Sequence, residues 1–337
     1  MDARALHDDA VIIDGLTFYS DGYAEGLLKA NIAATNLTVS HFEGEFERAA
    51  DDVAAWIARL AAPDCPWRRI ERAADIPAAR ADGKVGLIMG WQNMRPIGDN
   101  LDRIPMFHKL GLRVMQLTYN ARNYMGDGCL EACDGGLNAL GERAVRLMNQ
   151  TGVAVDLSHV GKRGTLRAAE ISDKPVLITH ANAEAVVASP RNKSDDEIVA
   201  VAATGGVIGT STYGAMCWPG DPKKPPTLDD YLRQLDHIVD LVGPAHVGIG
   251  TDFPAVSDPA VVKAVTEMTL ARSSGFIGAY AAAFGNDISG RYISECPDHA
   301  GLFHVTEALV GRGWAEADIR ALLGGNFLRA FGEIWGG

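Results

Sequence analysis

The stretch VAVDLSHVGKRGTLRAAEISDKPVLITH, residues 153–180, contains the unit from which the fold is built. It opens with a short apolar run at 153–158, continues with apolar residues at helical spacing over 162–171, and closes with a second apolar run at 175–179. Short apolar runs rich in Val and Ile are typical of strands that are buried on both faces. A strand, a helix and a second strand in succession predict parallel pairing of the two strands.

The same alternation extends along most of the chain. Strands are predicted at 11–14, 33–40, 85–90, 114–118, 153–158, 175–179, 206–211 and 247–251. Helices are predicted at 43–60, 138–151, 162–171, 194–203 and 227–242, and Ser194 with Glu197 three residues later is typical of a capping box. The Pro-rich segment 221–226 is expected to form a loop at the rim of the sheet.

Strands that alternate with helices in this way predict an α/β fold, and the simplest closure is a (β/α)8 or TIM barrel. Residues 305–312 and 315–331 are predicted to form helices that close the barrel. An open doubly wound sheet is the alternative, but no GxGxxG or GxxxxGK[ST] motif follows the first strand, which weakens the nucleotide-binding form of that fold. No low-complexity tract or clear linker interrupts the chain, so we expect one domain over residues 1–337.

Composition excludes several classes of protein. The chain is 47% hydrophobic, enough for a large core, and its net charge of −12 argues against a nucleic-acid partner. An odd number of cysteines, 5, does not fit a disulfide scaffold. The acidic N-terminal residues are unlike a signal peptide, and no run of roughly 18 apolar residues predicts a membrane span. We therefore expect a cytoplasmic protein that does not enter the membrane.

Two histidines follow neighbouring predicted strands. His159 comes after the fifth strand and His180 after the sixth, so their rings are expected to converge at the carboxyl-terminal edge of the barrel, where such folds carry out their chemistry. Asp252 follows the eighth strand and completes a set of two imidazoles and one carboxylate, which suits Zn²⁺ or a similar divalent ion. A bound ion of this kind lowers the pKa of its water toward ~7.

Simpler roles for these residues are also open. A histidine at a strand end is more often held structurally by a hydrogen bond, and Asp252 is also suited to cap the following loop. Cys129 and Cys133 have only a weak metal-binding spacing, so ordinary thiols are favoured. His41, after the second strand, is ambiguous.

Further polar side chains are predicted at the same edge of the barrel. Gln92 and Tyr119 follow the third and fourth strands. Arg191 lies in the loop after the sixth strand, where its guanidinium can bind a substrate carboxylate bidentately, and Asn192 is placed beside it as a second substrate-binding residue. Because the whole chain is acidic, Arg191 has to outweigh the overall charge if an anion binds.

The sequence resembles the renal or membrane dipeptidase family, peptidase M19. The resemblance is carried by DLSH at 156–159, THANAEAVVASPRN at 179–192 and GIGTDF at 248–253. It is supported by VIIDG at 11–15, KLGLRVMQLTYN at 109–120 and LLGGNFLRAF at 322–331, so it covers essentially the whole chain.

This resemblance implies a barrel of the metal-dependent, amidohydrolase-like type. It implies that His159 and His180 bind one of two zinc ions and that Arg191 contacts the substrate carboxylate. It also implies that Asp252 contacts the other zinc and shuttles a proton. A homodimer is a further expectation at the level of the family.

The sequence departs from the family pattern at four positions. Leu16 and Phe18 stand where the family has a His-x-Asp pair that binds one zinc, and Gln92 replaces the glutamate that bridges the two ions. Tyr119 replaces a substrate-binding histidine. We therefore expect one metal ion at most, on the two histidines named above, with help from Gln92 or Asp252.

Whether Asp127, Cys129 or Glu131 supplies a replacement metal ligand is left open by the sequence.

The sequence is compatible with two functions. The first is a metal-dependent hydrolase of dipeptides or small N-acyl amino acids, in which Asp252 moves a proton, Arg191 binds a carboxylate and Tyr119 contacts the substrate. The alternative is a metal-poor relative with isomerase, lyase or binding function. Both take a small molecule as partner.

Overall fold

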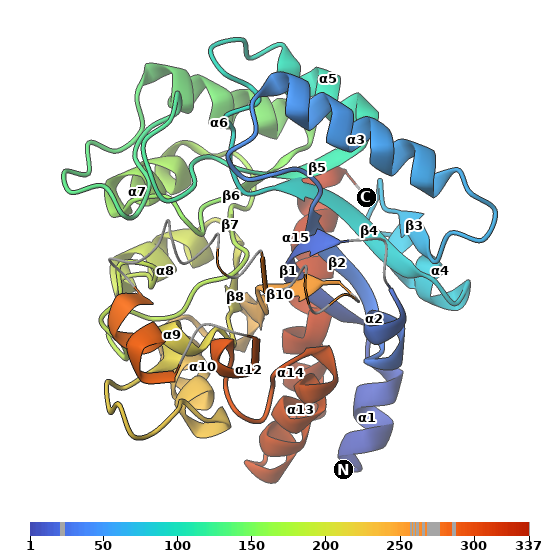
Figure 1. Cartoon of the computed structure of the whole chain (residues 1–337), viewed down its shortest axis with the longest axis vertical. Helices are drawn as coiled ribbons and strands as arrows, with labels where there is room; N and C mark the ends of the chain where they lie inside the picture. The colour runs from blue at the N-terminus through green and yellow to red at the C-terminus, as the bar shows by residue number, and fades with distance from the viewer. Residues whose placement is uncertain are drawn as a thin grey trace.

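Eight parallel strands close into a barrel in the computed structural model (Figure 1). The structure describes residues 1–20, 24–256, 258, 260, 263–264, 267, 277–284 and 288–336. The barrel strands are β1 (Ile12–Ser20), β2 (Ile32–Thr38), β4 (Val85–Trp91), β5 (Leu112–Gln116), β6 (Ala154–Asp156), β7 (Leu177–Ile178), β8 (Val207–Thr210) and β9 (Val247–Ile249). Pairing of Asp14 with Ile249 joins the last strand to the first, which confirms the barrel and excludes the open sheet.

Each of the eight predicted runs overlaps one of these strands, but β1 is longer than the predicted run at 11–14. In contrast, β6 and β7 are shorter than predicted. The cause is a buried aspartate at the end of β6. Its carboxylate accepts hydrogen bonds from the backbone N–H groups of Ser158, at 3.0 Å, and Thr179, at 3.1 Å. These two N–H groups are therefore bound by the Asp156 side chain and not by a neighbouring strand, so the ladder ends early.

Helices fill the connections between the strands, as the sequence predicts. They include α3 (Phe46–Leu60), α6 (Ala139–Thr151), α7 (Lys162–Ile171), α8 (Asp195–Ala203) and α10 (Leu228–Val242). The predicted capping box is present, because Ser194 and Glu197 exchange side-chain and backbone hydrogen bonds at the start of α8. The Pro-rich segment 221–226 lies outside helices and strands, between α9 (Gly214–Cys217) and α10.

Short elements were not predicted from the sequence. They are α1 (Ala3–Asp9), α2 (Glu25–Lys29), β3 (Trp67–Arg69), α4 (Asp75–Ala81), α5 (Arg103–Leu110), α9, β10 (Phe253–Ala255) and α12 (Ile288–Arg291). Each has 8 residues or fewer, whereas hydrophobic periodicity identifies a helix over a window of roughly 11–18 residues. The strand β3 pairs with β4 outside the ring, and β10 continues the sheet beside β1.

The C-terminal segment forms three helices, of which the first packs beside α1 and α10 in the outer ring and the last closes the amino-terminal end of the barrel. They are α13 (Leu302–Gly311), α14 (Glu316–Arg320) and α15 (Asn326–Trp335), with a π-helical turn (Ala321–Gly325) before α15 (Figure 1). Asn326 binds the carbonyls of Pro244 and Val247, which precede and begin β9. The ring of Phe327 packs into the barrel interior beside Gly248, where a Cβ atom would lie 2.6 Å from the ring.

The end of the barrel opposite Phe327 carries the polar side chains that the sequence places after the strands. Among the residues that the structure describes, no helix is both long enough and apolar enough to cross a membrane.

Candidate active site

A cavity lies at the carboxyl-terminal ends of the strands. Residues from the segments that follow seven barrel strands line it, together with β1 and one residue of α12: Phe18, Phe42, Gln92, Tyr119, Asn120, His159, Arg191, Tyr213, Met216, Asp252 and Arg291. The space open to the centres of water molecules is about 30 Å³. This volume holds only a few water molecules and is too small for a dipeptide-sized molecule. Side chains at the cavity wall therefore have to move when a substrate binds.

The two predicted histidines meet beside this cavity. His159 Nε2 and His180 Nε2 are 2.9 Å apart, and both side chains are buried. Burial and the nearby Arg191 guanidinium hold the pKa of each histidine well below its usual value. Both imidazoles are therefore neutral, which is the form that binds metal ions.

Hydrogen bonds at the opposite ring nitrogens fix how each imidazole points. His159 Nδ1 lies 2.8 Å from the amide oxygen of Asn120, so this nitrogen is the donor. His180 Nδ1 lies 2.8 Å from the hydroxyl oxygen of Thr179, which itself donates to Asp156 at 2.7 Å. His180 Nδ1 is thus a donor as well. The Nε2 lone pairs of both rings face each other, an arrangement that a cation between them stabilises.

Asp156 supports this arrangement from below. Its carboxylate is buried and accepts hydrogen bonds from the backbone and hydroxyl groups of both Ser158 and Thr179, at 2.6–3.1 Å. Burial nonetheless raises the pKa of Asp156. A chain from carboxylate to threonine to imidazole holds His180 in one orientation, as outer groups commonly do for metal-binding histidines.

The histidine pair fits one divalent ion. Two nitrogens each ~2.05 Å from a tetrahedral zinc ion lie about 3.3 Å apart, and the observed 2.9 Å separation needs only a small ring rotation to reach this value. Among the described residues no group of three or more His, Cys, Asp and Glu side chains is positioned to hold an ion. Asp252 lines the same cavity but does not join the histidines in such a group, so its role as a metal ligand stays a prediction.

Asp252 is held in an unusual backbone conformation at the cavity. Its φ is +60°, in the left-handed region that non-glycine residues rarely adopt. Its N–H donates to the Leu16 carbonyl at 3.1 Å, and the Tyr292 hydroxyl donates to its carbonyl at 2.6 Å. Functional sites often contain strain of this kind.

The carboxylate of Asp252 has the properties of a proton carrier. Burial, with a smaller effect of Asp14, raises the pKa of Asp252 to about 6, although Arg291 and Arg191 act against this rise. A carboxyl group with this pKa changes its protonation state near neutral pH. No hydrogen bond to this carboxylate from the described residues is present, so it is not used as a loop cap.

Asp14 positions the segment that carries Asp252. Its buried carboxylate accepts hydrogen bonds from the N–H of Thr251, at 2.8 Å, and from its hydroxyl, at 2.5 Å. His299 Nε2 lies 2.8 Å from the same carboxylate. The end of β9 is thus tied to β1 in the way that the end of β7 is tied to β6.

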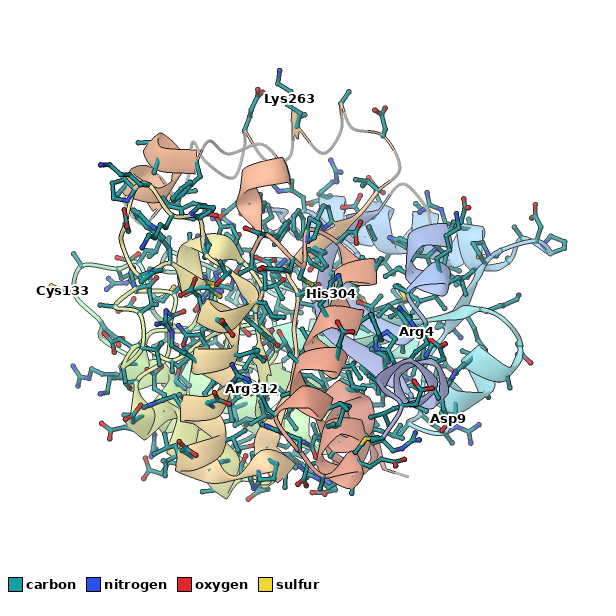
Figure 2. The ribbon with its side chains drawn as sticks, turned by 90° about the horizontal axis from the view of Figure 1, so that it is seen from below. Arg4, Asp9, Cys133, Lys263, His304 and Arg312 are labelled. Carbon is teal, nitrogen blue, oxygen red and sulfur yellow. The ribbon has the colours of Figure 1, made fainter. Side chains whose placement is uncertain are left out.

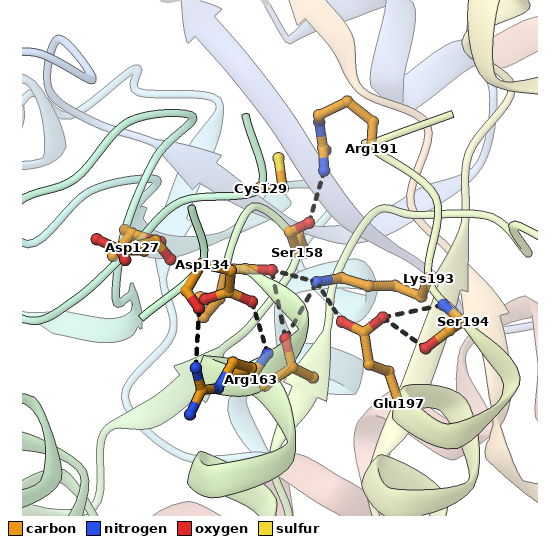
Figure 3. Close-up of polar contacts among 12 residues, drawn as sticks. Asp127, Cys129, Asp134, Ser158, Arg163, Arg191, Lys193, Ser194 and Glu197 are labelled. Carbon is orange, nitrogen blue, oxygen red and sulfur yellow. Dashed lines mark hydrogen bonds and ion pairs between the residues drawn. The ribbon is translucent and has the colours of Figure 1, made fainter. Parts of the chain in front are cut away.

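Arg191 reaches the cavity from the loop after β7. Its Nη1 donates to the Ser158 carbonyl at 2.6 Å, as Figure 3 shows, and its Nη2 donates to the His180 carbonyl at 3.4 Å. The loop is anchored by the buried Lys193, whose ammonium group binds the Val160 carbonyl at 2.6 Å and Glu197 at 3.1 Å (Figure 3). The guanidinium is therefore held rigidly beside the histidines.

Tyr119 and Gln92 also line the cavity. The ring of Tyr119 stacks on His159 with centroids 4.2 Å apart, and burial raises its pKa, so its hydroxyl remains a neutral donor. Gln92 Nε2 donates to Thr38 at 3.0 Å, which leaves its amide oxygen available to a ligand.

Asn192 lies outside the residues that line this cavity. Its Nδ2 donates to the carbonyls of Val187, at 2.8 Å, and Met216, at 3.1 Å, so it joins its own loop to α9. The geometry gives no support to its predicted contact with substrate.

None of the three residues considered as replacement ligands faces the histidine nitrogens. Asp127 forms an ion pair with Arg122, whose backbone N–H also binds Glu131 at 2.6 Å. Cys129 contacts Asn120, on the Nδ1 side of His159. Cys133 is exposed on an outer loop (Figure 2), so the two cysteines do not form a metal site.

The side of the cavity near β1 carries no metal ligand at the positions of Leu16 and Phe18, and both side chains are buried. Arg291 points into this region, with its guanidinium carbon 5.1 Å from the centre of the Phe18 ring. Arg291 is not predicted from the sequence. It follows β9 by some forty positions, and no strand-end pattern marks it.

Comparisons with known proteins agree with this architecture. Residues 47–273 match the family model of membrane dipeptidases, peptidase family M19. An uncharacterised dipeptidase of Schizosaccharomyces pombe is 30% identical over 186 residues, which cover 54% of this chain and 44% of that protein. The chain spans about half the length of the curated relatives it matches.

Solved structures with the same fold include two from Pseudomonas aeruginosa. An amidohydrolase is 28% identical, with a TM-score of 0.85 and coverage of 100% of both chains. The probable dipeptidase PvdM is 21% identical, with a TM-score of 0.80 and coverage of 99% of this chain and 97% of the other. With the barrel, the histidine pair and the family match taken together, the chain belongs to the membrane dipeptidase family, peptidase family M19.

Proposed function

We propose that this chain hydrolyses the amide bond of dipeptides or small N-acyl amino acids, with one divalent cation at its active site. The observation that carries the proposal is the convergence of the two neutral Nε2 atoms of His159 and His180 beside a cavity that Asp252 and Arg191 also line. When bound there, a cation supplies polarisation of the scissile carbonyl and a lower pKa for water.

Arg191 binds and orients the substrate in this proposal. Its two Nη groups are held by the carbonyls of Ser158 and His180, so the guanidinium reaches a substrate carboxylate without losing much freedom. The neutral hydroxyl of Tyr119 donates a hydrogen bond to the substrate from the neighbouring wall.

Asp252 moves the proton. Above a pH of about 6 its carboxylate is ionised and accepts a proton from the attacking water. The same group then donates this proton to the nitrogen of the leaving amine. The absence of a hydrogen-bonded partner among the described residues keeps both oxygens available for this transfer.

The small volume of the cavity requires one part of its wall to move when substrate binds. Phe42 stacks on Tyr119 with ring centroids 4.6 Å apart, and it comes from the loop after β2. We infer that Phe42 swings away from Tyr119 to admit substrate.

The non-hydrolytic alternative has less support. The relatives are named as dipeptidases or an amidohydrolase, and the lost ligands at Leu16 and Phe18 leave the histidine pair intact. Zinc as the ion, a single domain over residues 1–337, a homodimer and a cytoplasmic location remain predictions from the sequence.

Metal-dependent turnover tests the proposal. Purified protein is assayed against a library of dipeptides and N-acyl amino acids, before and after dialysis against a chelator and with zinc added back. We expect hydrolysis of at least one member, lost on chelation and restored by zinc. No metal-stimulated turnover of any member would contradict the proposal.

A further inference from the structure

Arg291 is a buried cation with unused hydrogen-bond donors. Its side chain is only 3% exposed, and its Nε and Nη1 atoms have no hydrogen-bond partner among the described residues. It takes part in none of the ion pairs between described side chains. Asp252 on the same cavity attracts the guanidinium electrostatically, but buried donor nitrogens without an acceptor are costly, so this arrangement is expected to serve a ligand.

Aromatic rings surround the guanidinium, and two of them, Phe18 and Tyr213, also line the cavity. Its central carbon lies 5.1 Å from the ring centres of Phe18 and Tyr213 and 5.9 Å from that of Tyr292. The ring faces stabilise a cation, and the Tyr292 hydroxyl is also a hydrogen-bond partner of Arg291, but Nε and Nη1 of the guanidinium remain without an acceptor among the described residues. Because Arg291 also lines the cavity, a ligand there is able to reach its donors.

The charges around the cavity favour an anion. Arg191 and Arg291 both line it, and Asp252 is the one acidic side chain among its described lining residues. The wall therefore carries an excess of positive charge within a chain whose net charge is −12.

The two arginines come from different parts of the barrel. Arg191 is tied to carbonyls after β6 and β7, whereas Arg291 lies beside Phe18 of β1 and Tyr213 after β8. Each is held by its own surroundings, which favours two separate anionic groups over one group shared between both.

We propose that Arg291 binds a second anionic group of the substrate. The preferred substrate is then an amide with two carboxylates, such as a dipeptide or N-acyl amino acid that contains Asp or Glu. Arg191 takes one carboxylate and Arg291 takes the other. This inference rests on the proposed function for the identity of the bond that is cleaved, but the binding of a dianion is testable without turnover.

The test measures the binding of N-acetyl-L-glutamate and N-acetyl-L-glutamine by titration calorimetry. The two ligands have similar shapes and differ by one negative charge. A charge-assisted hydrogen bond to Arg291 predicts that the wild type binds the glutamate ligand about ten- to a hundredfold more tightly. Arg291→Met should bind both ligands equally. Arg312→Met, which removes an exposed arginine on α13's end, should keep the wild-type preference.

Several results would overturn the proposal. One is equal affinity of the wild type for both ligands, a result that needs no variant to fold. Another is a glutamate preference that persists in folded Arg291→Met, as judged by its thermal unfolding. A third is an equal loss of affinity for both ligands in Arg291→Met, which would mean that the two arginines share one carboxylate. Arg291→Lys keeps the charge and should retain part of the preference.

Binding and hydrolysis fail in different ways in this design. A protein that distinguishes the two ligands but hydrolyses no amide would contradict the proposed function and leave the dianion site standing. A protein that hydrolyses an amide but binds N-acetyl-L-glutamate and N-acetyl-L-glutamine equally well would contradict the dianion site and leave the proposed function standing.

Discussion

The two sides of the active-site cavity are built alike but carry different chemistry. On one side, Asp156 fixes Thr179 after β7, and on the other Asp14 fixes Thr251 after β9. The first support presents His180, a neutral ligand whose partner is His159. The second presents Asp252 beside Phe18 and Arg291, where a fixed guanidinium stands near positions that lack metal ligands.

The two aspartate–threonine contacts are alike, but the residues that follow them bind different kinds of ligand. The histidine side is prepared for a cation, because its donors are neutral and oriented. The Arg291 side already contains a positive charge, which disfavours a second metal ion by like-charge repulsion. We infer that the protein binds one cation on one side and one anionic substrate group on the other.

Removal of the proton carrier should have the largest effect. Asp252→Asn keeps the shape of the side chain but cannot accept a proton, so kcat should fall about 10²–10⁴-fold. The thermal unfolding midpoint at pH 7 should stay level or rise, because burial disfavours the carboxylate in the wild type. Steady-state kinetics and calorimetry test both parts. Activity within threefold of the wild type would mean that another group transfers the proton.

Loss of either histidine should remove the cation from the protein. His159→Gln and His180→Gln each delete one Nε2 of the converging pair, so neither should retain metal after gel filtration. Elemental analysis of the wild type should give about one ion per chain at most. Stoichiometric metal in both variants would place the ion elsewhere, and two ions in the wild type would contradict the asymmetry of the two sides.

Loss of the Thr179 hydroxyl, which orients His180, should weaken cation binding less than loss of His180 itself. Thr179→Val breaks the chain from Asp156 to the imidazole and should weaken cation affinity about 10–100-fold. Thr210→Val is a matched control, because the hydroxyl of Thr210, in β8, binds Tyr231 of α10 and touches neither histidine. Competition with a chromophoric chelator measures both. Equal affinities in the two variants would show that Thr179 does not orient the ligand.

The smallest expected effect is a shift in the pH dependence of kcat/KM when Arg291 is replaced. This shift tests whether Arg291 and Asp252 interact electrostatically. The ionised form of Asp252 is the active one, so kcat/KM should fall as the pH drops through about 6. Arg291 lowers the pKa of Asp252, so Arg291→Met should move this acid limb to higher pH. An unchanged limb would mean that the two side chains do not interact electrostatically.

Much of the fold is visible in the sequence because the barrel strands are buried on both faces. Runs such as 85–90 and 247–251 are continuous and apolar, so all eight were found, whereas short elements such as α9 and β10 were not. The ends of β6 and β7 differ from prediction because the Asp156 side chain binds backbone N–H groups. Such a bond depends on a contact between strands and leaves no periodic signal.

The site was predicted only where its residues follow strands. His159, His180, Arg191 and Asp252 share this position, and the structure brings them to one cavity or its edge. Asn192 is predicted to bind substrate, but its side chain turns toward α9. Arg291 reaches the cavity from a helix outside the strand pattern, so only the folded chain reveals it.

Anomalous diffraction at the zinc absorption edge, from crystals grown with excess zinc, tests the central claim most directly. We expect one peak within bonding distance of His159 Nε2 and His180 Nε2, and none beside Phe18 and Arg291. Two peaks, or a peak on the Arg291 side alone, would contradict it.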